Sequence, residues 1–176
     1  GIIEWSGVIK PRITNFPAST LDIFPTIAEI IKLPKSNLLN PIDGTSLCPV
    51  FKSDLKKRKK MIPFRINDKA AIVDNNFKLV VTSLEKQNFE LYNLEADPTE
   101  SINISKEKPD IFKKMKTEFM LWNKTVQMSL EGRDYSEGKL FEQPVSHFWM
   151  HDDRYKPFIK DWINRPEYRE RIILGR

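Results

Sequence analysis

The stretch MIPFRINDKAAIVDNNFKLVVTSLEKQNFELYNL, residues 61–94, decides the fold of this chain. Its apolar residues come in short β-type runs, which read MIPF, AAIV, FKLVV and FELYNL. Turn-forming residues separate the runs: Asn67-Asp68, Asp74-Asn75-Asn76 and Lys86-Gln87-Asn88. This spacing predicts an antiparallel meander of three or four strands. Such a sheet needs a cover over its apolar face.

The next segment predicts that cover, a long helix over residues 109–131. Pro109 suits its first turn and Gly132 suits its C-terminal end. Between them runs an apolar stripe at three- and four-residue steps: Phe112, Met115, Phe119, Trp122 and Val126. The sequence therefore predicts an α+β arrangement, in which a long helix covers a small antiparallel sheet.

Another helix is predicted upstream, over residues 20–33. Its apolar positions fall at i, i+3, i+4 and i+7, which places them on one packed face: Phe24, Ile27, Ala28 and Ile31. Ser19 and Thr20 suit the N-cap, and Pro34 ends the helix.

The chain opens directly in β-type sequence. Ile2, Ile3 and Trp5 form a short run, which Ser6 and Gly7 close. Native termini are usually polar and loosely held. We therefore expect the chain to begin in the middle of a domain, with further polypeptide upstream.

Composition excludes several classes of protein. The 176 residues carry 29 Lys and Arg against 24 Asp and Glu, and this charge permits an anionic partner without requiring one. A single Cys excludes a disulfide scaffold. The apolar runs are shorter than the roughly 20 residues of a bilayer-spanning helix. Residues 1–9 lack the pattern of a signal peptide.

Residues 133–176 form a tail rich in aromatic residues and Arg. A short helix is predicted from Tyr155 to Asn164, broken by Pro166. His147 and His151 lie four residues apart, a spacing that suits zinc on a helix. They lack the glutamate of an H-E-x-x-H motif, and only the aspartates that follow could add a ligand.

Four motifs occur in a fixed order along the chain. They are D-x-x-P-T at Asp22, Pro25 and Thr26; D-G-x-S-L at Asp43, Gly44, Ser46 and Leu47; F-K-L at Phe77, Lys78 and Leu79; and E-L-Y-N-L-x-x-D-P-x-E at Glu90, Leu91, Tyr92, Asn93, Leu94, Asp97, Pro98 and Glu100. A long helix containing Trp122 follows. With the opening GIIEWSGVI, this order over residues 1–135 resembles the C-terminal part of type I sulfatases of the arylsulfatase and N-acetylgalactosamine-6-sulfatase kind, in the alkaline phosphatase superfamily.

The chain departs from the family pattern in places. The Arg that often precedes the F-K-L strand is absent, since this stretch reads Ala71-Ile72-Val73-Asp74. The family's N-L-A reads Asn103-Ile104-Ser105. The tail is not general to the family, although S-L-x-G-x-D-Y at residues 129–135 is similar to a segment of some polysaccharide sulfatases.

The resemblance implies a division of the chain into three parts. Residues 1–60 would be the end of the sulfatase α/β domain, with a strand, the helix and a loop. Residues 61–132 would be the C-terminal subdomain, and residues 133–176 an aromatic and basic tail. The missing N-terminal catalytic domain would be the partner of this subdomain, and the family places such enzymes in the periplasm, outside the cell or in the lysosome.

The resemblance also implies a chemistry. Sulfatases hydrolyse sulfate esters with a formylglycine, made from the Cys or Ser of a C/S-x-P-x-R motif, and with a calcium ion that binds the sulfate. Positive charge is needed to hold the anion while the hydrated aldehyde attacks sulfur. Cys48 is followed by Pro-Val-Phe-Lys, which is not that motif. No catalytic or metal-binding residue is therefore assigned here: calcium and formylglycine are expected upstream, and the chain alone is expected to be inactive.

Candidate binding residues lie in the tail. If it folds back over the sulfatase pocket, His147, His151 or Arg154 would meet a sulfated sugar, because His and Arg suit such anions. Elsewhere the structural interpretation is favoured. Asp22 suits a helix cap. The motif carboxylates Glu90, Asp97 and Glu100 suit a strand and its following turn.

Two other functions stay open. The basic run LKKRKK, residues 55–60, is most simply solvated surface, but it could make the chain a non-catalytic module that binds anionic, sulfated glycans. Nucleic-acid binding is disfavoured, because no helix presents a basic recognition face. The expected partners are the catalytic domain and a sulfated glycan or aryl sulfate, with no nucleic acid and no membrane span.

Overall fold

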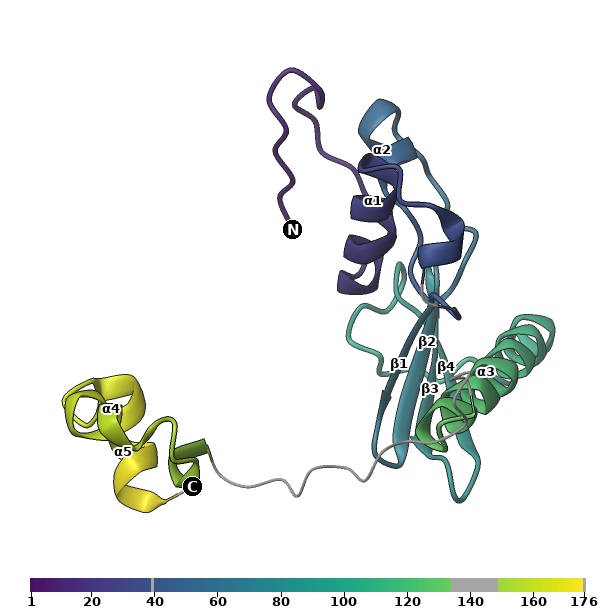
Figure 1. Ribbon diagram of the computed structural model, residues 1–176. Coiled ribbons are helices and arrows are strands. Elements are labelled where there is room, and N and C mark those ends of the chain that lie inside the picture. The colour runs from purple at the N-terminus through teal and green to yellow at the C-terminus, as the bar shows by residue number, and fades with distance from the viewer. Residues whose placement is uncertain (39, 134–148, 176) are drawn as a thin grey trace. The chain divides into compact units, whose positions relative to one another are not determined.

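The computed structural model describes residues 1–38, 40–133 and 149–175. The chain divides into two units, Gly1–Leu130 and Glu131–Arg176. Figure 1 shows the strands and most of the helices in the first unit, and α4 and α5 in the second. No described helix is both long enough and apolar enough to cross a membrane.

The predicted meander is confirmed. Its strands are β1 (Ile62–Ile66), β2 (Lys69–Asp74), β3 (Phe77–Ser83) and β4 (Asn88–Asn93), paired antiparallel in the order β1-β2-β3-β4. Asn67, Asn75 and Gln87 each adopt a positive φ in the turns between the strands. These turns lie where the sequence places its turn formers, and the α+β fold class is correct.

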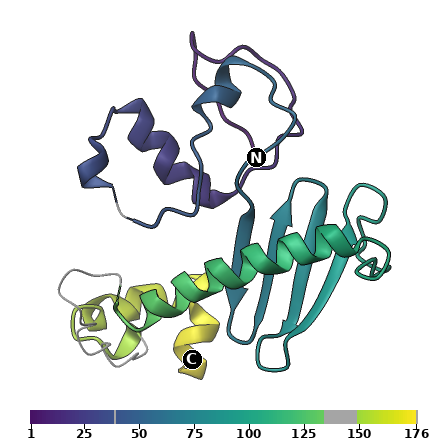
Figure 2. The same cartoon turned by 90° about the vertical axis from the view of Figure 1, so that its right-hand side faces the viewer.

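The covering helix is α3 (Pro109–Leu130), which crosses one face of the sheet (Figure 2). Its stripe meets the sheet residues in a core whose members are Met61, Ala70, Ile72, Leu79, Val81, Leu91, Met115 and Phe119. Phe119 lies at the centre: it is fully buried, and its ring centroid is 5.9 Å from that of Phe89 and 6.0 Å from that of Trp122. The core sits between the sheet and α3.

The N-terminal part of the first unit has no strand among its described residues. It contains the 3-10 helix η1 (Thr20–Asp22), α1 (Ile23–Ile30), η2 (Lys35–Asn37) and α2 (Cys48–Lys52). The predicted helix is therefore present, although α1 ends earlier than expected, before Lys32, which has a positive φ. The β-type run at residues 2–5 forms no strand, because no described strand lies beside it to pair with its backbone.

The predicted packed face of α1 is wrong in most of its members. Ala28 is buried, but Phe24, Ile27 and Ile31 are exposed. The buried side of the helix instead carries Asp22 and Thr26, two residues of the D-x-x-P-T motif. Hydrogen bonds to the chain that follows hold this polar side inward, so the apolar stripe faces out.

The second unit contains η3 (Trp149–His151), α4 (Lys156–Trp162) and α5 (Pro166–Leu174). The predicted short helix is α4, and Pro166 begins the next helix instead of only ending the first. Aromatic rings of α4 and α5 pack on one another. The ring centroid of Trp162 lies 5.6 Å from that of Phe158 in α4 and 5.6 Å from that of Tyr168 in α5.

Candidate functional site

The sheet has a second face, directed away from α3. Side chains alternate between the faces, so one row on this face runs across the strands through Phe64, Ala71, Val80 and Glu90. Its apolar part lies on β1, β2 and β3, where Phe64 and Ile66 stay 49% and 70% exposed. Its polar part lies on β3 and β4. We call this surface the open face.

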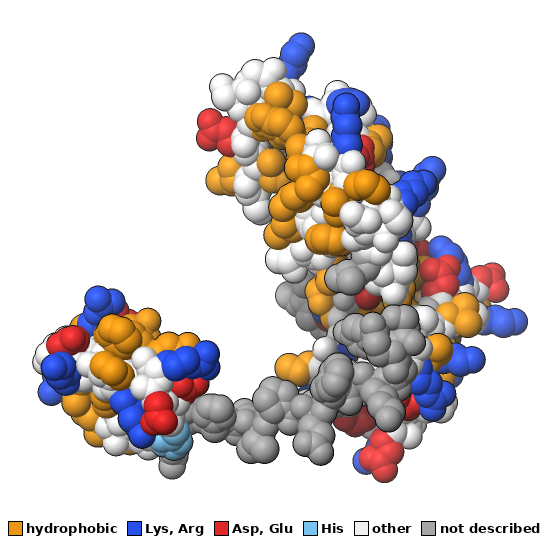
Figure 3. Space-filling view, viewed as in Figure 1, with side chains coloured by type: hydrophobic (Ala, Val, Ile, Leu, Met, Phe, Trp, Pro, Cys, Tyr) orange, Lys and Arg blue, Asp and Glu red, His pale blue; other side chains and the backbone are white. Residues whose placement is uncertain are grey.

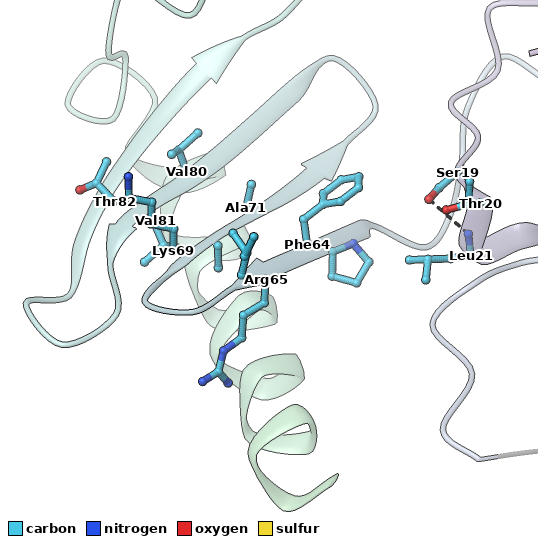
Figure 4. Close-up of a pocket in the computed structure, with 13 residues that line it drawn as sticks. Ser19, Thr20, Leu21, Phe64, Arg65, Lys69, Ala71, Val80, Val81 and Thr82 are labelled. Carbon is cyan, nitrogen blue, oxygen red and sulfur yellow. Dashed lines mark hydrogen bonds between the residues drawn. The ribbon is translucent and has the colours of Figure 1, made fainter. Parts of the chain in front are cut away.

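A cavity of about 780 Å³ lies over the apolar part of the open face (Figure 4). Ser19, Thr20 and Leu21 line one end, and Phe64, Ile66, Val80 and Thr82 are among the sheet residues that line the rest. Arg65 points the other way, toward α3, where its guanidinium donates a hydrogen bond to Asn123 Oδ1 at 2.9 Å. The lining of the cavity is thus mostly apolar, and Lys69 is the further charged residue at its border.

The polar side chains of the open face form hydrogen bonds with neighbouring side chains in two pairs. Lys78 Nζ donates to both carboxylate oxygens of Glu100, at 2.6 and 2.8 Å. The Tyr92 hydroxyl donates to Glu90 at 2.8 Å, and this hydrogen bond, with burial and nearby carboxylates, raises the pKa of Tyr92 to about 12. Lys78 of the F-K-L motif thereby joins β3 to the last residue of the longest motif.

Asp97, the remaining motif carboxylate, organises the turn after β4. It accepts hydrogen bonds from the backbone N–H groups of Ser101 and Ile102, both at 2.8 Å. The hydrogen bond from Ile102 is the main reason that the pKa of Asp97 lies below its usual value. The structural interpretation of these three carboxylates agrees with the geometry, since each is already engaged by neighbours within the fold.

The two upstream motifs meet at Asp22, which accepts a hydrogen bond from Thr45 of the second motif. Asp22 also forms a buried ion pair with Arg58 of the basic run. The guanidinium of Arg58 donates to both carboxylate oxygens of Asp22, at 2.7 Å each. The same carboxylate accepts from the backbone N–H groups of Ser19 and Thr45. Burial alone would raise the pKa of Asp22, but these hydrogen bonds and the charge of Arg58 hold it below its usual value. Asp22 stands at the N-cap position of α1, but its side chain makes no cap hydrogen bond to that helix; it closes a capping box with Ser19 at η1 and pairs with Arg58.

Arg58 also corrects the interpretation of the basic run. The run is not all solvated surface, because Arg58 is only 4% exposed and donates to the carbonyl oxygens of Pro17 and Lys60. Its backbone N–H donates to Asn75 Oδ1 in the β2–β3 turn. Sequence reasoning missed this role. The available signal was one Arg among lysines, since the planar guanidinium suits a buried carboxylate far better than an ammonium does.

Thr26 and Gly44 complete the contact between the first two motifs. Thr26 Oγ1 accepts from the backbone N–H of Leu47 at 2.9 Å and donates to the carbonyl of Asp22 at 2.6 Å. Gly44 lies so close to η1 that a Cβ atom there would be 1.9 Å from the carbonyl oxygen of Leu21. The motif glycine is required because two backbone segments touch.

We expect Gly44→Ala to lower the free energy of unfolding by about 3 kcal/mol, toward the upper end of overpacking costs, because the clash is with backbone that no rotamer change can relieve. Urea unfolding followed by circular dichroism measures the change. Gly1→Ala is the matched control, since a Cβ at Gly1 meets no atom within 4 Å. A Gly44→Ala protein no less stable than Gly1→Ala would contradict the close packing of the two motifs.

The predicted binding residues lie in the second unit. His147 falls outside the described residues. His151 lies exposed in η3. The guanidinium of Arg154 donates to both carboxylate oxygens of Asp152, at 2.6 to 3.1 Å. Within the ranges that the structure describes, no group of three or more metal-ligating side chains occurs. The substrate role of these residues stays a prediction.

The curated relatives of this chain are sulfatases, the class of protein that the motifs indicate. No known family profile matches the chain. The N-acetylgalactosamine-6-O-sulfatase of Bacteroides thetaiotaomicron is 26% identical over 127 residues, which cover 65% of this chain and 25% of that protein. A sulfatase of Formosa agariphila is 29% identical over 150 residues, which cover 69% of this chain and 26% of that protein. The chain thus spans about a quarter of the length of these curated relatives.

Solved structures agree in fold. The structure of yidJ from Bacteroides fragilis, itself assigned as a sulfatase, superposes with a TM-score of 0.54 at 15% identity, covering 67% of this chain and 27% of that one. The crystal structure of Ps i-CgsB superposes with a TM-score of 0.51 at 24% identity, covering 86% of this chain and 30% of that one. In sequence and in fold, the chain resembles the C-terminal part of a sulfatase.

Proposed function

We propose that this chain is the C-terminal part of a sulfuric ester hydrolase, and that the longer protein hydrolyses sulfate esters of a carbohydrate. The match to an N-acetylgalactosamine-6-O-sulfatase over 127 residues carries this proposal. The structure supports it, because the residues shared with the sulfatase pattern take part in the contacts that hold this fold together.

The chain's own part in this activity is structural. Its motif carboxylates are engaged within the fold, and Cys48 lies outside any formylglycine motif. The described residues offer no cluster that would hold a calcium ion. The formylglycine, the calcium ion and the groups that protonate the leaving alcohol would all come from the catalytic domain upstream.

The apolar part of the open face would pack against that domain. Exposed apolar surface of this kind is typical of an interface whose partner is missing. The second unit would form part of the pocket wall, with His147, His151 and Arg154 near the sulfated sugar. A solved complex of i-CgsB with k-i-k-neocarrahexaose, at a TM-score of 0.51, is consistent with an oligosaccharide substrate. A periplasmic, secreted or lysosomal location is part of the same proposal.

Sulfate release tests the proposal. The complete polypeptide encoded by the gene and this chain alone are each incubated with N-acetylgalactosamine 6-sulfate and with 4-nitrophenyl sulfate, and free sulfate is measured. We expect release by the complete polypeptide and none above the buffer rate by the chain alone. An inactive complete polypeptide that carries formylglycine would contradict the substrate class. Hydrolysis by the chain alone would contradict its structural role.

A second candidate function rests on the basic run. With Arg58 turned inward, Lys56, Lys57 and Lys59 still lie exposed on one loop. As a glycan-binding module, the chain would be retained on a heparin column at low salt, and replacing these three lysines by Ala would remove the retention. Passage through the column at low salt would exclude this function.

A further inference from the structure

A cavity of about 340 Å³ lies at the outer edge of β4, beside the β3–β4 turn and the first turns of α3. Most of the side chains that line it are polar, among them the amides of Gln87, Asn88 and Asn103. Phe89 and Phe112 supply aromatic surface. A cavity of a few hundred Å³ with a small number of placed polar groups is typical of sites that bind one small molecule.

Lys116 brings a cation to this cavity without an anion to balance it. The side chain is half-buried, and its Nζ lies 4.5 Å from the ring centroid of Phe89. Among the described residues this ammonium has no carboxylate partner and no hydrogen-bond acceptor. A ring face attracts an ammonium group but takes none of its three N–H donors in an ordinary hydrogen bond. Lys116 can therefore still bind an anion.

The edge of β4 adds backbone groups to the same cavity. Leu91 uses this edge twice: its N–H donates to Asn103 Oδ1 at 3.2 Å, and its carbonyl accepts from the N–H of Ile104 at 2.8 Å. Because the direction of these groups alternates along a strand, Phe89 presents its N–H and C=O on the same edge. No described segment pairs with them there. The loop that covers Leu91 thus leaves one donor and one acceptor at the cavity.

Two side chains of the lining have part of their hydrogen-bonding capacity left. Asn103 Oδ1 accepts from the backbone N–H groups of Leu91 and Ser105, whereas its Nδ2 group donates to none of the described residues. The Glu90 carboxylate accepts from the Tyr92 hydroxyl through one oxygen and has further lone pairs to offer. The cavity therefore combines a cation, several neutral donors and a carboxylate acceptor.

This combination favours a sugar over a simple anion. A free sulfate ion would meet the Glu90 carboxylate as well as the Lys116 ammonium, and the like charges would repel. A sugar with an anionic substituent can place that substituent on Lys116 and its hydroxyl groups on Glu90, since a hydroxyl both donates and accepts.

The surface around the cavity indicates a defined site rather than a general patch for polyanions. On the side where α3 lies, Figure 3 shows Lys and Arg side chains interspersed with Asp and Glu. Lys114 on the same helix is already paired with Asp74, at 2.9 Å. Mixed charges of this kind produce no strong field of one sign. Attraction for an anion is therefore expected to depend on Lys116 itself.

We propose that this cavity binds one sugar unit that carries an anionic group, either a sulfate or a carboxylate. The anionic group lies on Lys116, and the hydroxyl groups bond to Glu90, Asn103 and the edge of β4 at Phe89. The site holds a glycan without hydrolysing it, so the proposal does not depend on the sulfatase activity. It also differs from the basic run, whose lysines do not line this cavity.

Hydrogen–deuterium exchange of the native polypeptide tests the site, because the Phe89 amide reports on this cavity. The probes are N-acetylgalactosamine 6-sulfate, glucuronic acid, neutral N-acetylgalactosamine and sodium sulfate, each added over a range of concentrations. We expect an anionic sugar to slow the exchange of residues 88–90 and to leave that of β2 unchanged. The anionic sugar that acts at the lower concentration identifies the substituent. A neutral sugar or sodium sulfate that acts equally well would overturn the assignment of an anionic sugar, and no slowing by any probe would overturn the site.

A pair of substitutions tests the role of the cation. Lys116→Met removes the charge but keeps an apolar stem on Phe89, so the fold is preserved. Lys113→Met is the matched control, because Lys113 is exposed on the same helix and does not line the cavity. We expect Lys116→Met to raise the sugar concentration needed for the slowing about tenfold or more, and Lys113→Met to leave it unchanged. Equal responses of the two variants would overturn the site.

The sulfatase assay keeps this site distinct from the proposed function. A native polypeptide in which an anionic sugar protects residues 88–90, but which releases no sulfate, would keep the site and contradict the activity. One that releases sulfate without this protection would keep the activity and overturn the site.

Discussion

Replacing Arg58 by Ala is expected to lower the free energy of unfolding by about 3–5 kcal/mol, the usual cost of leaving a buried charge without its partner. Asp22 is fully buried, and Arg58 is the cation that donates to both of its oxygens. The hydrogen bonds between the backbone of Arg58 and Asn75 in the β2–β3 turn remain possible in this variant. The loss should therefore fall mainly on the N-terminal part, where the Arg58 side chain also donates to the carbonyl oxygen of Pro17. Urea unfolding followed by circular dichroism at pH 7 measures it.

The matched control is Lys56→Ala, which removes an exposed cation from the same run. We expect this variant to stay within about 0.5 kcal/mol of the unsubstituted protein, as surface substitutions usually do. Arg58→Ala behaving like Lys56→Ala would contradict the buried ion pair.

The ion pair also fixes the sign of a pH dependence. The pKa of Asp22 is lower in the folded chain than its usual value. Its contribution to stability is therefore complete above the unfolded-state pKa of about 3.9, and is lost as the pH falls through the folded value. We expect acid to destabilise the unsubstituted protein more than Asp22→Asn, measured as the urea midpoint from pH 6 to pH 2.5. Parallel pH profiles for the two proteins would contradict this assignment.

Replacing Phe119 by Ala is expected to cost about 3–5 kcal/mol, because it opens a cavity at the centre of the core. Phe119 is fully buried between the sheet and α3, against Phe89 and Trp122. The neighbouring Met120 is 41% exposed on the same helix, so Met120→Ala is the matched control and should cost less than about 1 kcal/mol. Similar losses for the two variants, measured by thermal unfolding, would mean that α3 does not cover the sheet as described.

The sequence predicts the sheet and α3 because their signals are local. Alternation, turn formers and a helical stripe all lie within the segment that folds on itself, and each element packs against its neighbour in the chain. The stripe of α1 is equally regular, and its interpretation as a face packed within this chain is wrong. Periodicity shows that Ile27 and Ile31 share a face, but it does not show which part of a protein covers that face.

Arg58 illustrates the other limit of local patterns. Its partner Asp22 lies 36 residues away, and the single Arg in LKKRKK, although it suits a buried carboxylate, does not show which carboxylate it meets. The motif glycine is similar: a turn explains a Gly at position 44, but only the structure reveals the contact with Leu21. In the structure, polar residues of the motifs form hydrogen bonds between segments that lie apart in the sequence. The predicted tail site could not be judged in the same way, because His147 lies outside the described residues.

The most direct test of the central claim is the length of the native polypeptide. Its gene should be read upstream of the codon for Gly1, and the size of the mature protein checked by mass spectrometry with peptides from residues 61–130. We predict one polypeptide several times longer than this chain, with a C/S-x-P-x-R motif upstream whose first residue is found as formylglycine. A native protein that begins at Gly1, or one whose upstream part lacks that motif, would contradict the claim that this chain is the C-terminal part of an active sulfatase.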